Sequence, residues 1–394
     1  MGDRFLLTYI MQIEEHVPLA SLTTFGIGGE ARYFVRVRTV EGLRESLDFL
    51  RPGSGQGAQN KNAPVYILGG GSNTLVPDSG FEGLVIKIEI AGIEIQEERY
   101  KKGEDSVSNA KTETEENKTL VVVGAGESWD GLVQYAVEHG LWGLENLSGI
   151  PGTVGGAAWG NIGAYGASAS QSVAWVEAYD RVQRELVRLD ASLCAFGYRD
   201  SFFKQRASRY IITRVAFALS RVAQPNLVYK DLALRFATAQ QSKITEQKTT
   251  SEVEVTIEQE TEPTLANIRD AVLAIRREKF PDLAIEGTAG SFFKNPIVSK
   301  EVAAALVAKY PHMPTFALPE AAGVKIPLAW LLDQVLQLRG FSVGGARLFE
   351  HQPLVLVASR GASSADVRTL ASEVQQKVSD AFGIRLEKEV QEMR

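Results

Sequence analysis

The segment Gly143–Gly166 reads GLENLSGIPGTVGGAAWGNIGAYG. One third of its residues are glycine, but it also holds leucine, isoleucine, valine, tryptophan and tyrosine. A flexible linker would be rich in Gly and Ser and would lack such large apolar side chains. Glycine has no β-carbon, so other groups can approach its backbone closely. We therefore predict a packed loop region whose backbone comes close to a neighbouring group.

A second glycine-rich loop, GGGSN at Gly69–Asn73, follows the apolar run Val65–Leu68. Three glycines in a row allow successive backbone N–H groups to point the same way and to form a nest for phosphate oxygens. An ordinary β-turn is an equal alternative for this loop taken alone. Together with Gly152–Gly156 and Asn161–Gly166, the loop could hold a pyrophosphate group from two sides.

The segment Val121–Gly126, VVVGAG, looks like the start of a dinucleotide-binding fingerprint, in which a strand runs into G-x-G-x-x-G. Trp129 occupies the third glycine position, where its side chain would obstruct the close approach of helix and strand. The sequence also has no G-x-x-x-x-G-K-[ST] motif. We therefore expect neither a Rossmann nucleotide site nor a P-loop.

The composition is that of an ordinary globular protein, with 44% apolar and 23% charged residues, which excludes disordered, collagen-like and coiled-coil chains. Cys194 is the single cysteine, so neither a disulfide framework nor a multi-cysteine zinc or iron–sulfur site is expected. The four histidines are too widely spaced to suggest a metal site. A net charge of −6 argues against nucleic-acid binding, which normally needs a basic face.

The length of 394 residues suggests two or three domains. No run of about 18 apolar residues is present, so we expect no helix that crosses a membrane. The N-terminal segment Met1–Gln12 lacks the architecture of a secretion signal. A protein of the reducing cytoplasm is the expectation that follows.

Apolar periodicity predicts helices and strands between the loops. One helix is predicted over Leu265–Ile275, after Pro263, and another over Val367–Val378, ended by Gly383. The predicted strands are Val65–Leu68, Leu84–Ile88, Leu120–Val123 and Leu354–Val357. Because strands and helices mix without a regular β–α–β alternation, the expected fold class is α+β rather than a doubly wound sheet.

Three polar segments are predicted to be solvated loops or extended hairpins: Arg51–Ala63, Gln96–Lys118 and Thr238–Pro263. Gln96–Lys118 holds seven acidic and five basic residues, and Thr238–Pro263 holds six and two. These two segments account for the whole net charge of −6, so the rest of the chain is formally neutral. The neutral core can bind anionic ligands without repulsion from its own net charge.

Seven motifs are spread over nearly the whole chain: TFGIGG at Thr24–Gly29, GGGSN at Gly69–Asn73, GLENLSGIPGTVGG at Gly143–Gly156, NIGAYG at Asn161–Gly166, FGYRDSFFK at Phe196–Lys204, AGSFFKNP at Ala289–Pro296 and LEKEV at Leu386–Val390. In kind and order they resemble the motifs of the UDP-N-acetylenolpyruvoylglucosamine reductases, flavoenzymes of cell-wall synthesis. The segment Leu227–Leu232, LVYKDL, resembles the tyrosine loop of the family's longer form, type I, which closes over the substrate. Two positions depart from the family pattern. Thr23 stands where Asn is usual before Thr-Phe-Gly, and Lys388 where Pro is usual in L-E-P-E-V.

The resemblance implies a two-part FAD-binding region of the PCMH or vanillyl-alcohol-oxidase-like type and an α+β substrate-binding domain. Residues 1–87 and 88–280 would form two subdomains that bind FAD between them. Residues 281–382 would form the substrate-binding domain, and 383–394 a C-terminal segment that returns to the active site. NADPH would be the reductant, and a monomer is expected.

FAD would be bound non-covalently, because no His or Cys lies in the glycine-rich loops. Two groups of residues are expected to hold it. The pyrophosphate would lie against Gly69, Gly70, Gly71, Ser72 and Asn73, and backbone contacts would come from Gly155, Gly156, Ile162 and Gly163.

The family reaction reduces the enolpyruvyl ether of UDP-N-acetylglucosamine enolpyruvate to UDP-N-acetylmuramate. A site for it needs donors for the substrate carboxylate and one proton donor. Arg199 matches the family's arginine, whose planar guanidinium suits a carboxylate. Ser291 matches the proton donor, and Glu389 the glutamate that acts beside the arginine. Taken singly, they could be a surface turn, a turn hydroxyl and a half-exposed strand residue, but their joint presence in matching motifs favours the catalytic roles.

Three further residues match substrate contacts of the family. Lys279, at the end of the first predicted helix, would bind the diphosphate, although a lysine that stabilises the helix dipole is a strong alternative. Asn295 would be a second contact. Tyr229 could lay its ring on the substrate and donate through its hydroxyl, or it could simply anchor a strand.

Two other functions stay open as alternatives. Another flavoprotein of the same fold, such as a carbohydrate oxidase, would commonly tether its flavin through His and would lack the GSFFKNP motif. A non-enzymatic UDP-sugar sensor descended from the reductases is the second alternative. The intact residues Arg199, Ser291 and Glu389 argue against such a loss of activity.

Overall fold

The computed structural model describes residues 12–50, 63–96, 118–237, 263–318 and 323–394. Most of the three predicted solvated loops lies outside the described residues. The chain divides into two compact units. Unit 1 comprises Met1–Val37, Gly42–Lys87 and Lys279–Arg394, and unit 2 comprises Arg38–Glu41 and Ile88–Glu278. The four-part domain division implied by the resemblance stays a prediction.

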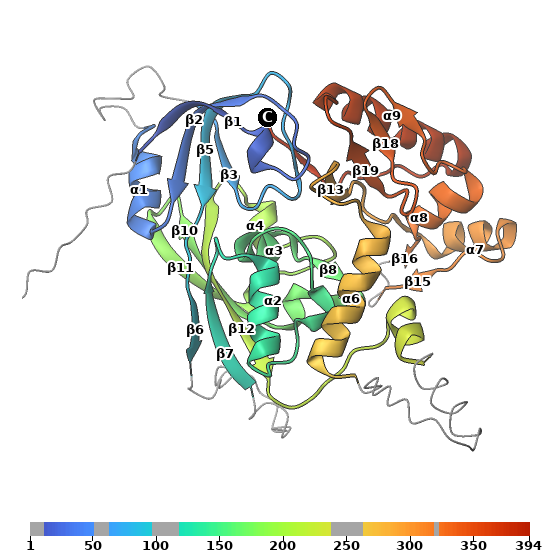
Figure 1. Ribbon diagram of the computed structural model, residues 1–394, viewed down its shortest axis with the longest axis horizontal. Coiled ribbons are helices and arrows are strands. Elements are labelled where there is room, and N and C mark those ends of the chain that lie inside the picture. The colour runs from blue at the N-terminus through green and yellow to red at the C-terminus, as the bar shows by residue number, and fades with distance from the viewer. Residues whose placement is uncertain (1–11, 51–62, 97–117, 238–262, 319–322) are drawn as a thin grey trace, which may run out of the picture. The chain divides into compact units, whose positions relative to one another are not determined.

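The N-terminal part of unit 1 is a four-stranded sheet in the order β1–β2–β5–β3 (Figure 1). Strands β1 and β2 are antiparallel, and β3 runs parallel to β5. Leu19, Phe34, Leu68 and Val85 form part of its buried core. The elements are β1 (Glu14–Pro18), η1 (Ala20–Leu22), β2 (Glu30–Val37), α1 (Val40–Asp48), β3 (Val65–Leu68), β4 (Thr74–Leu75) and β5 (Phe81–Ile88).

The C-terminal part of unit 1 has a second sheet, β13–β19–β18–β17, against which helix α9 packs. The α9 helix begins with a capping box made by Ser363 and Asp366 and ends at Gly383, whose φ is +67°. Between β13 and β17 along the chain, three short strands form a separate sheet in the order β14–β16–β15. The elements are β13 (Gly287–Ser291), β14 (Ile297–Val298), α7 (Lys300–Lys309), β15 (Phe316–Ala317), β16 (Val324–Lys325), α8 (Leu328–Trp330), the π-helical turn η5 (Leu331–Val335), β17 (Ser342–Val343), β18 (Ala346–Leu348), β19 (Val355–Ala358) and α9 (Ser364–Phe382).

The end of the chain returns to the N-terminal sheet of unit 1. Strand β20 (Gln391–Glu392) pairs in parallel with β4. The Gln391 N–H donates to the Asn73 carbonyl at 3.0 Å, and Met393 is buried in the core around Phe34. Residues more than 300 positions apart in sequence are therefore neighbours within this unit.

Unit 2 is built on an antiparallel five-stranded sheet in the order β11–β10–β12–β7–β6. Helix α3 packs on β12 and β7, and α2 packs on α3. Helix α6 buries Leu265, Ile268, Val272 and Ile275. The elements are β6 (Ile93–Gln96), β7 (Lys118–Gly124), α2 (Trp129–Glu138), η2 (Glu145–Leu147), α3 (Val154–Gly160), β8 (Gly163–Ala164), β9 (Ala167–Ser168), η3 (Ala169–Gln171), β10 (Val173–Asp180), β11 (Glu185–Asp190), η4 (Ala191–Leu193), α4 (Phe202–Gln205), β12 (Tyr210–Ser220) and α6 (Leu265–Lys279).

The predicted elements are confirmed. The two predicted helices correspond to α6 and α9. The four predicted strands correspond to β3, β5, β7 and β19, the last displaced by one residue. The rejection of a Rossmann site is also correct, because β7 pairs antiparallel with both neighbours. Trp129 is 1% exposed, and its indole N–H donates to the Leu147 carbonyl. The fold class is α+β, as predicted.

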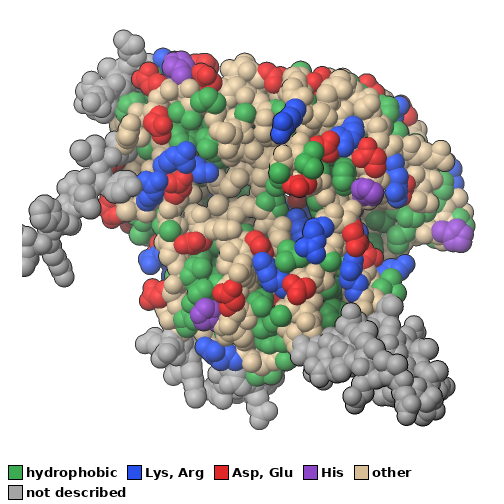
Figure 2. Space-filling model, in the orientation of Figure 1, with side chains coloured by type: hydrophobic (Ala, Val, Ile, Leu, Met, Phe, Trp, Pro, Cys, Tyr) green, Lys and Arg blue, Asp and Glu red, His purple; other side chains and the backbone are tan. Residues whose placement is uncertain are grey.

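None of the described helices is long and apolar enough to cross a bilayer. Figure 2 shows acidic and basic side chains interspersed over the visible face. This mixture of both signs agrees with a net charge close to zero for the chain outside the two acidic segments 96–118 and 238–263.

Candidate active site

The loop Gly69–Asn73 of unit 1 has the properties of an oxyanion nest. None of the hydrogen bonds among the described residues is donated by a backbone N–H of this half-buried loop. Gly71 has a φ of +65°, and a β-carbon there would lie 2.2 Å from the Leu22 carbonyl oxygen, so only glycine fits. Successive amides without protein acceptors suit the oxygens of a pyrophosphate. The donor set therefore fits the pyrophosphate of FAD.

Thr24 connects this loop to the strand that carries Ser291. The Thr24 N–H donates to the Gly71 carbonyl at 3.2 Å. Its hydroxyl donates to the Thr288 carbonyl at 2.6 Å, and its own carbonyl accepts from the Thr288 N–H at 3.0 Å. The TFGIGG motif therefore holds β13 beside the glycine loop, a structural role that the sequence alone does not reveal.

Ser291 is the last residue of β13 and follows a bulge. The pairing of β13 with β19 changes register between Thr288 and Ser291, and Gly290 has a φ of +73°. A bulge of this kind re-aims the next side chain. Ser291 is half-buried, and its hydroxyl makes no hydrogen bond within the described part of the chain. The hydroxyl is thus available to a ligand.

Glu389 lies on the segment next to Ser291. The Glu389 N–H donates to the Phe292 carbonyl at 2.8 Å, and the Glu389 carbonyl accepts from the side-chain amide of Asn73 at 3.1 Å. Unit 1 therefore brings together three predicted site residues: the proton donor, the glutamate and the last residue of the glycine loop. Asn73 has a structural role here in addition to any contact with the cofactor.

Arg199 of unit 2 lies at the tip of a tight hairpin closed by Gly197 and Asp200. Its φ of +56° is left-handed, a conformation that costs free energy for a residue with a β-carbon. Several contacts hold it, among them two hydrogen bonds: Arg199 Nη2 donates to the Gly163 carbonyl at 2.7 Å, and Lys204 Nζ donates to the Arg199 carbonyl at 2.9 Å. A β-carbon at Gly163 would lie 3.0 Å from Arg199 Nη1. Glycine at 163 thus leaves room for the guanidinium.

Three of the predicted flavin-binding residues of unit 2 use their backbone N–H groups in hydrogen bonds within the protein. The N–H groups of Gly155 and Ile162 donate to the carbonyls of Ala125 and Ala157, at 2.9 and 3.0 Å. Gly156 N–H faces the capping hydroxyl of Thr153 at 3.4 Å. A contact of Gly155 or Ile162 with FAD would therefore come from close approach rather than from donation by these amides, and it stays a prediction.

The three predicted substrate contacts are all half-buried. The Tyr229 ring packs edge-on against Tyr165, with ring centroids 5.1 Å apart. Lys279 is the last residue of α6. The Asn295 side-chain oxygen accepts from the Leu328 N–H at 2.9 Å, at the start of α8. The structure thus places Tyr229 in unit 2 and Asn295 in unit 1.

Known proteins match the chain over nearly its whole length. The model "UDP-N-acetylenolpyruvoylglucosamine reductase, C-terminal domain" matches residues 282–393, and an FAD binding domain model matches residues 33–189. A UDP-N-acetylenolpyruvoylglucosamine reductase from Ralstonia nicotianae is 39% identical over 378 residues, which are 96% of this chain and 98% of that protein. This chain belongs to the UDP-N-acetylenolpyruvoylglucosamine reductase family.

Other members of the family agree. The reductases from Pseudomonas putida and Neisseria meningitidis are 37% and 36% identical, each over 96% of this chain. The crystal structure of the reductase from Thermus caldophilus has the same fold, with a TM-score of 0.60 and 24% identity over 98% of this chain and 100% of that chain. The resemblance, the α+β fold with an FAD-binding region and the FAD cofactor are therefore confirmed.

Lys388, where the family usually has proline, lies opposite Phe293 in an isolated antiparallel bridge. The bridge is made by the N–H groups of Lys294 and Glu389, at 2.9 and 2.8 Å, and neither bond uses the N–H of Lys388. A proline can therefore occupy this position without the loss of a bridge hydrogen bond. The lysine instead adds an ion pair with Glu392, at 2.6 Å.

We expect Lys388→Pro to change the melting temperature by only a few degrees and to leave flavin binding intact. The lost ion pair contributes at most about 1 kcal/mol, and the fixed φ of proline partly offsets it. Thermal unfolding followed by tryptophan fluorescence measures the shift, and Lys388→Ala separates the loss of the side chain from the effect of the ring. A collapse of flavin binding in Lys388→Pro alone would show that the backbone here does not accept the family residue.

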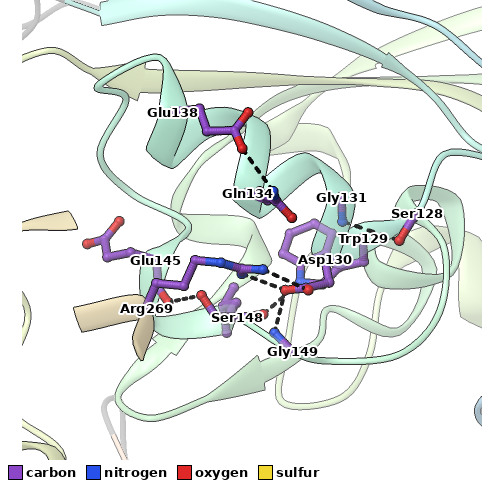
Figure 3. Close-up of polar contacts among 11 residues, drawn as sticks. Ser128, Trp129, Asp130, Gly131, Gln134, Glu138, Glu145, Ser148, Gly149 and Arg269 are labelled. Carbon is purple, nitrogen blue, oxygen red and sulfur yellow. Dashed lines mark hydrogen bonds and ion pairs between the residues drawn. The ribbon is translucent and has the colours of Figure 1, made fainter. Parts of the chain in front are cut away.

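Asp130 of α2 anchors the loop that precedes α3, as Figure 3 shows. Its carboxylate accepts from the Gly149 N–H at 2.5 Å and from both terminal nitrogens of Arg269, at 2.7 and 2.9 Å. Burial raises the pKa of Asp130, but the Arg269 and Gly149 hydrogen bonds and the charges of Arg269 and Arg276 outweigh it and hold the pKa below its usual range. The charged carboxylate thus ties the GIPG turn to α2 and α6.

We expect Asp130→Asn to lower the free energy of unfolding at pH 7 by about 1 kcal/mol, because Arg269 loses a charged acceptor that is partly exposed. The pKa of Asp130 is lower in the folded state, so its contribution is present above the unfolded pKa and is lost as the pH falls through the folded pKa. Urea unfolding of both proteins at neutral and at acidic pH measures this. The difference between them should shrink in acid, and an equal difference at both pH values would exclude a role for the charge.

Proposed function

We propose that this chain is an FAD-dependent, NADPH-driven reductase that converts UDP-N-acetylenolpyruvoylglucosamine to UDP-N-acetylmuramate in peptidoglycan precursor synthesis. A monomer in the cytoplasm is part of the proposal. The observation that carries it is the arrangement in unit 1, in a chain 39% identical to a reductase of this name. There, hydrogen bonds connect the segment of Glu389 to Phe292, which follows the half-buried Ser291, and to Asn73 of the glycine loop. Thr24 connects the same loop to β13, the strand of Ser291.

Reduced FAD, when bound, supplies the hydride for the terminal carbon of the alkene. The amides of Gly69–Asn73 hold the cofactor pyrophosphate in this proposal. Ser291 gives its hydroxyl proton to the adjacent carbon, so that one C–H bond forms from the hydride and a second from the proton. A hydroxyl is a weak acid, so this transfer needs a strongly basic carbon and a site with little water. The half-buried position of Ser291 supports that requirement.

Arg199 binds the carboxylate that is conjugated to the alkene. Negative charge moves onto this carboxylate as the alkene accepts hydride, so a fixed guanidinium stabilises the transition state more than the ground state. Glu389 acts on the same enolic intermediate in this proposal. Its carboxyl group must be protonated or paired with a cation at that step, because a charged carboxylate would repel the developing enolate. Lys279, Asn295 and Tyr229 bind the nucleotide-sugar part of the substrate.

The test is a visible absorption spectrum of the purified protein under nitrogen. Yellow protein should bleach with NADPH and regain its colour when UDP-N-acetylenolpyruvoylglucosamine is added. A colourless protein that binds no added FAD would sink the proposal. Reduction by a sugar followed by reoxidation with oxygen would instead identify a carbohydrate oxidase. Binding of the UDP-sugar without reoxidation would identify a sensor.

A further inference from the structure

Asn146 is a buried residue of unit 2 that the proposed reaction does not use. It lies in η2 and is 2% exposed. Its side-chain nitrogen donates to two carbonyls, that of Tyr165 at 2.7 Å and that of Asn226 at 2.8 Å. Because both partners are carbonyl oxygens, the NH2 group and not the amide oxygen must face them. Asn146 thus joins the NIGAYG hairpin to the start of the segment that carries Tyr229.

The amide oxygen of Asn146 is buried and accepts no hydrogen bond within the described residues. A buried acceptor without a donor destabilises a fold. An apolar side chain of similar size would remove this cost but would leave two carbonyls without donors. Among side chains of this size, only a primary amide offers two N–H donors on one nitrogen. The choice of asparagine is therefore explained by the connection it makes between the two segments.

Asn226 extends this connection toward Tyr229. Its side-chain nitrogen donates to the Gly166 carbonyl at 3.1 Å, and its side-chain oxygen accepts from the Val228 N–H at 3.2 Å. A β-carbon at Gly166 would lie 3.7 Å from the Tyr229 nitrogen, so the hairpin and the segment are in close contact. The preceding residues 221–225 and Val228 are exposed, whereas Leu232 is fully buried beyond Tyr229. The Asn146 bonds therefore hold the side of the segment that has few apolar anchors.

We propose that Asn146 is a positioning residue for substrate binding. It fixes residues 226–229, called here the Tyr229 segment, against Tyr165, and so sets the place of the Tyr229 ring. The proposal rests on the proposed function, since it takes Tyr229 to contact the nucleotide-sugar. Asn146 takes no part in the hydride or proton step. Its loss should therefore weaken substrate binding more than it slows the chemistry.

Asn146→Asp keeps the shape of the side chain but replaces the NH2 group by a carboxyl oxygen, which repels the two carbonyls that the amide bonded. Asn161→Asp is the matched control, because Asn161 is also buried, but its side chain bonds Gly197 and Ser170, on the Arg199 side. We expect Asn146→Asp to raise KM for the UDP-sugar about tenfold with kcat within about twofold of wild type. Asn161→Asp should instead lower kcat. An unchanged KM in Asn146→Asp, or a loss of kcat alone, would overturn the proposal.

Combination with Tyr229→Ala tests whether Asn146 acts through Tyr229. In the Tyr229→Ala background, Asn146→Asp should raise KM by less than about twofold, because the group that it positions is already absent. A tenfold effect that persists there would place the action of Asn146 elsewhere.

Limited proteolysis of the FAD-bound protein gives a readout that does not depend on turnover. Trypsin can cut at Arg221 and Lys230, which are exposed and flank the Tyr229 segment. We expect cleavage there, measured well below the melting temperature of each protein, to become several-fold faster in Asn146→Asp and to stay at the wild-type rate in Asn161→Asp. If wild type did not turn over the UDP-sugar, the proposed function would fail while this measurement still tested the positioning. Equal cleavage in all three proteins would refute it.

Discussion

Replacing Ser291 by alanine should leave the reduction of the flavin by NADPH within about twofold of wild type and slow its reoxidation by substrate by about 10²–10⁴-fold, the usual contribution of a positioned proton donor. The reason is that hydride transfer to the flavin needs no proton from the protein, whereas the second half-reaction leaves a carbon that must be protonated. The Ser291 hydroxyl makes no hydrogen bond within the described residues, so its removal leaves no buried partner unsatisfied. Anaerobic stopped-flow absorbance separates the two half-reactions.

Ser299 offers a matched control for this prediction. Its side-chain oxygen caps α7 by accepting from the Val302 N–H, and it is exposed. Ser299→Ala should cost about 1 kcal/mol of stability, as the loss of a helix cap does, and leave both half-reactions unchanged. Equal reoxidation rates in Ser291→Ala and wild type would remove Ser291 from the reaction. A parallel loss of both half-reactions would point to damage of the flavin site.

The apolar pattern predicted the helices better than the largest sheet. In α6 the buried residues Leu265, Ile268, Val272 and Ile275 are the periodic ones. Strand β10, in contrast, is buried at every position, including Glu177 and Asp180. A strand that is covered on both faces shows no alternation of polar and apolar residues, so the period-two signal is absent. Its charged residues are neutralised by partners, Arg214 for Glu177 and Arg209 for Asp180, that only the fold identifies.

The candidate site could be predicted at the level of motifs but not at the level of individual contacts. The sequence places Gly155 and Gly69 in similar glycine-rich loops. Only the structure distinguishes the Gly155 N–H, which donates to the Ala125 carbonyl, from the backbone N–H groups of Gly69–Asn73, which have no acceptor among the described residues. Thr24 and Thr288 are likewise in contact although 264 residues separate them. Such long-range contacts leave no local pattern, because they depend on how distant segments pack.

The polar residues that hold the site lie inside the motifs but were not among the predicted site residues. Lys204 bonds the carbonyl of Arg199 itself, and Asn161 bonds that of Gly197, two residues before Arg199. Asn146 bonds the carbonyl of Asn226, three residues before Tyr229. For the two asparagines a chemical signal exists: a buried side-chain amide needs hydrogen-bond partners, and in a glycine-rich loop backbone groups are the commonest ones. A sequence does not say which carbonyls these are, so the positioning roles emerge only from the fold.

Replacing Arg199 by lysine should slow reoxidation of the flavin by substrate about 10²–10³-fold, the scale seen when one donor to a developing charge is removed. Lysine keeps the positive charge, but it cannot present two parallel N–H groups to a carboxylate. One guanidinium nitrogen, Nη2, already donates to the Gly163 carbonyl. A lysine ammonium that made this bond would have no second nitrogen to offer to a ligand. Reduction by NADPH should be unchanged, and KM for the substrate should rise less than kcat falls, since the interaction is strongest in the transition state.

The backbone makes this substitution a clean test. A left-handed φ costs lysine about as much as arginine, because both carry a β-carbon, so Arg199→Lys should not change stability through the hairpin. Arg206 supplies the control: it is exposed and its guanidinium stacks on Phe202, 4.2 Å from the ring centroid. Arg206→Lys should leave both half-reactions within about twofold of wild type, because a surface charge of this kind contributes little. If the flavin of Arg199→Lys were also reoxidised by substrate within about twofold of the wild-type rate, Arg199 would serve only to shape the hairpin. A selective loss in Arg199→Lys would locate the carboxylate of the substrate at its guanidinium.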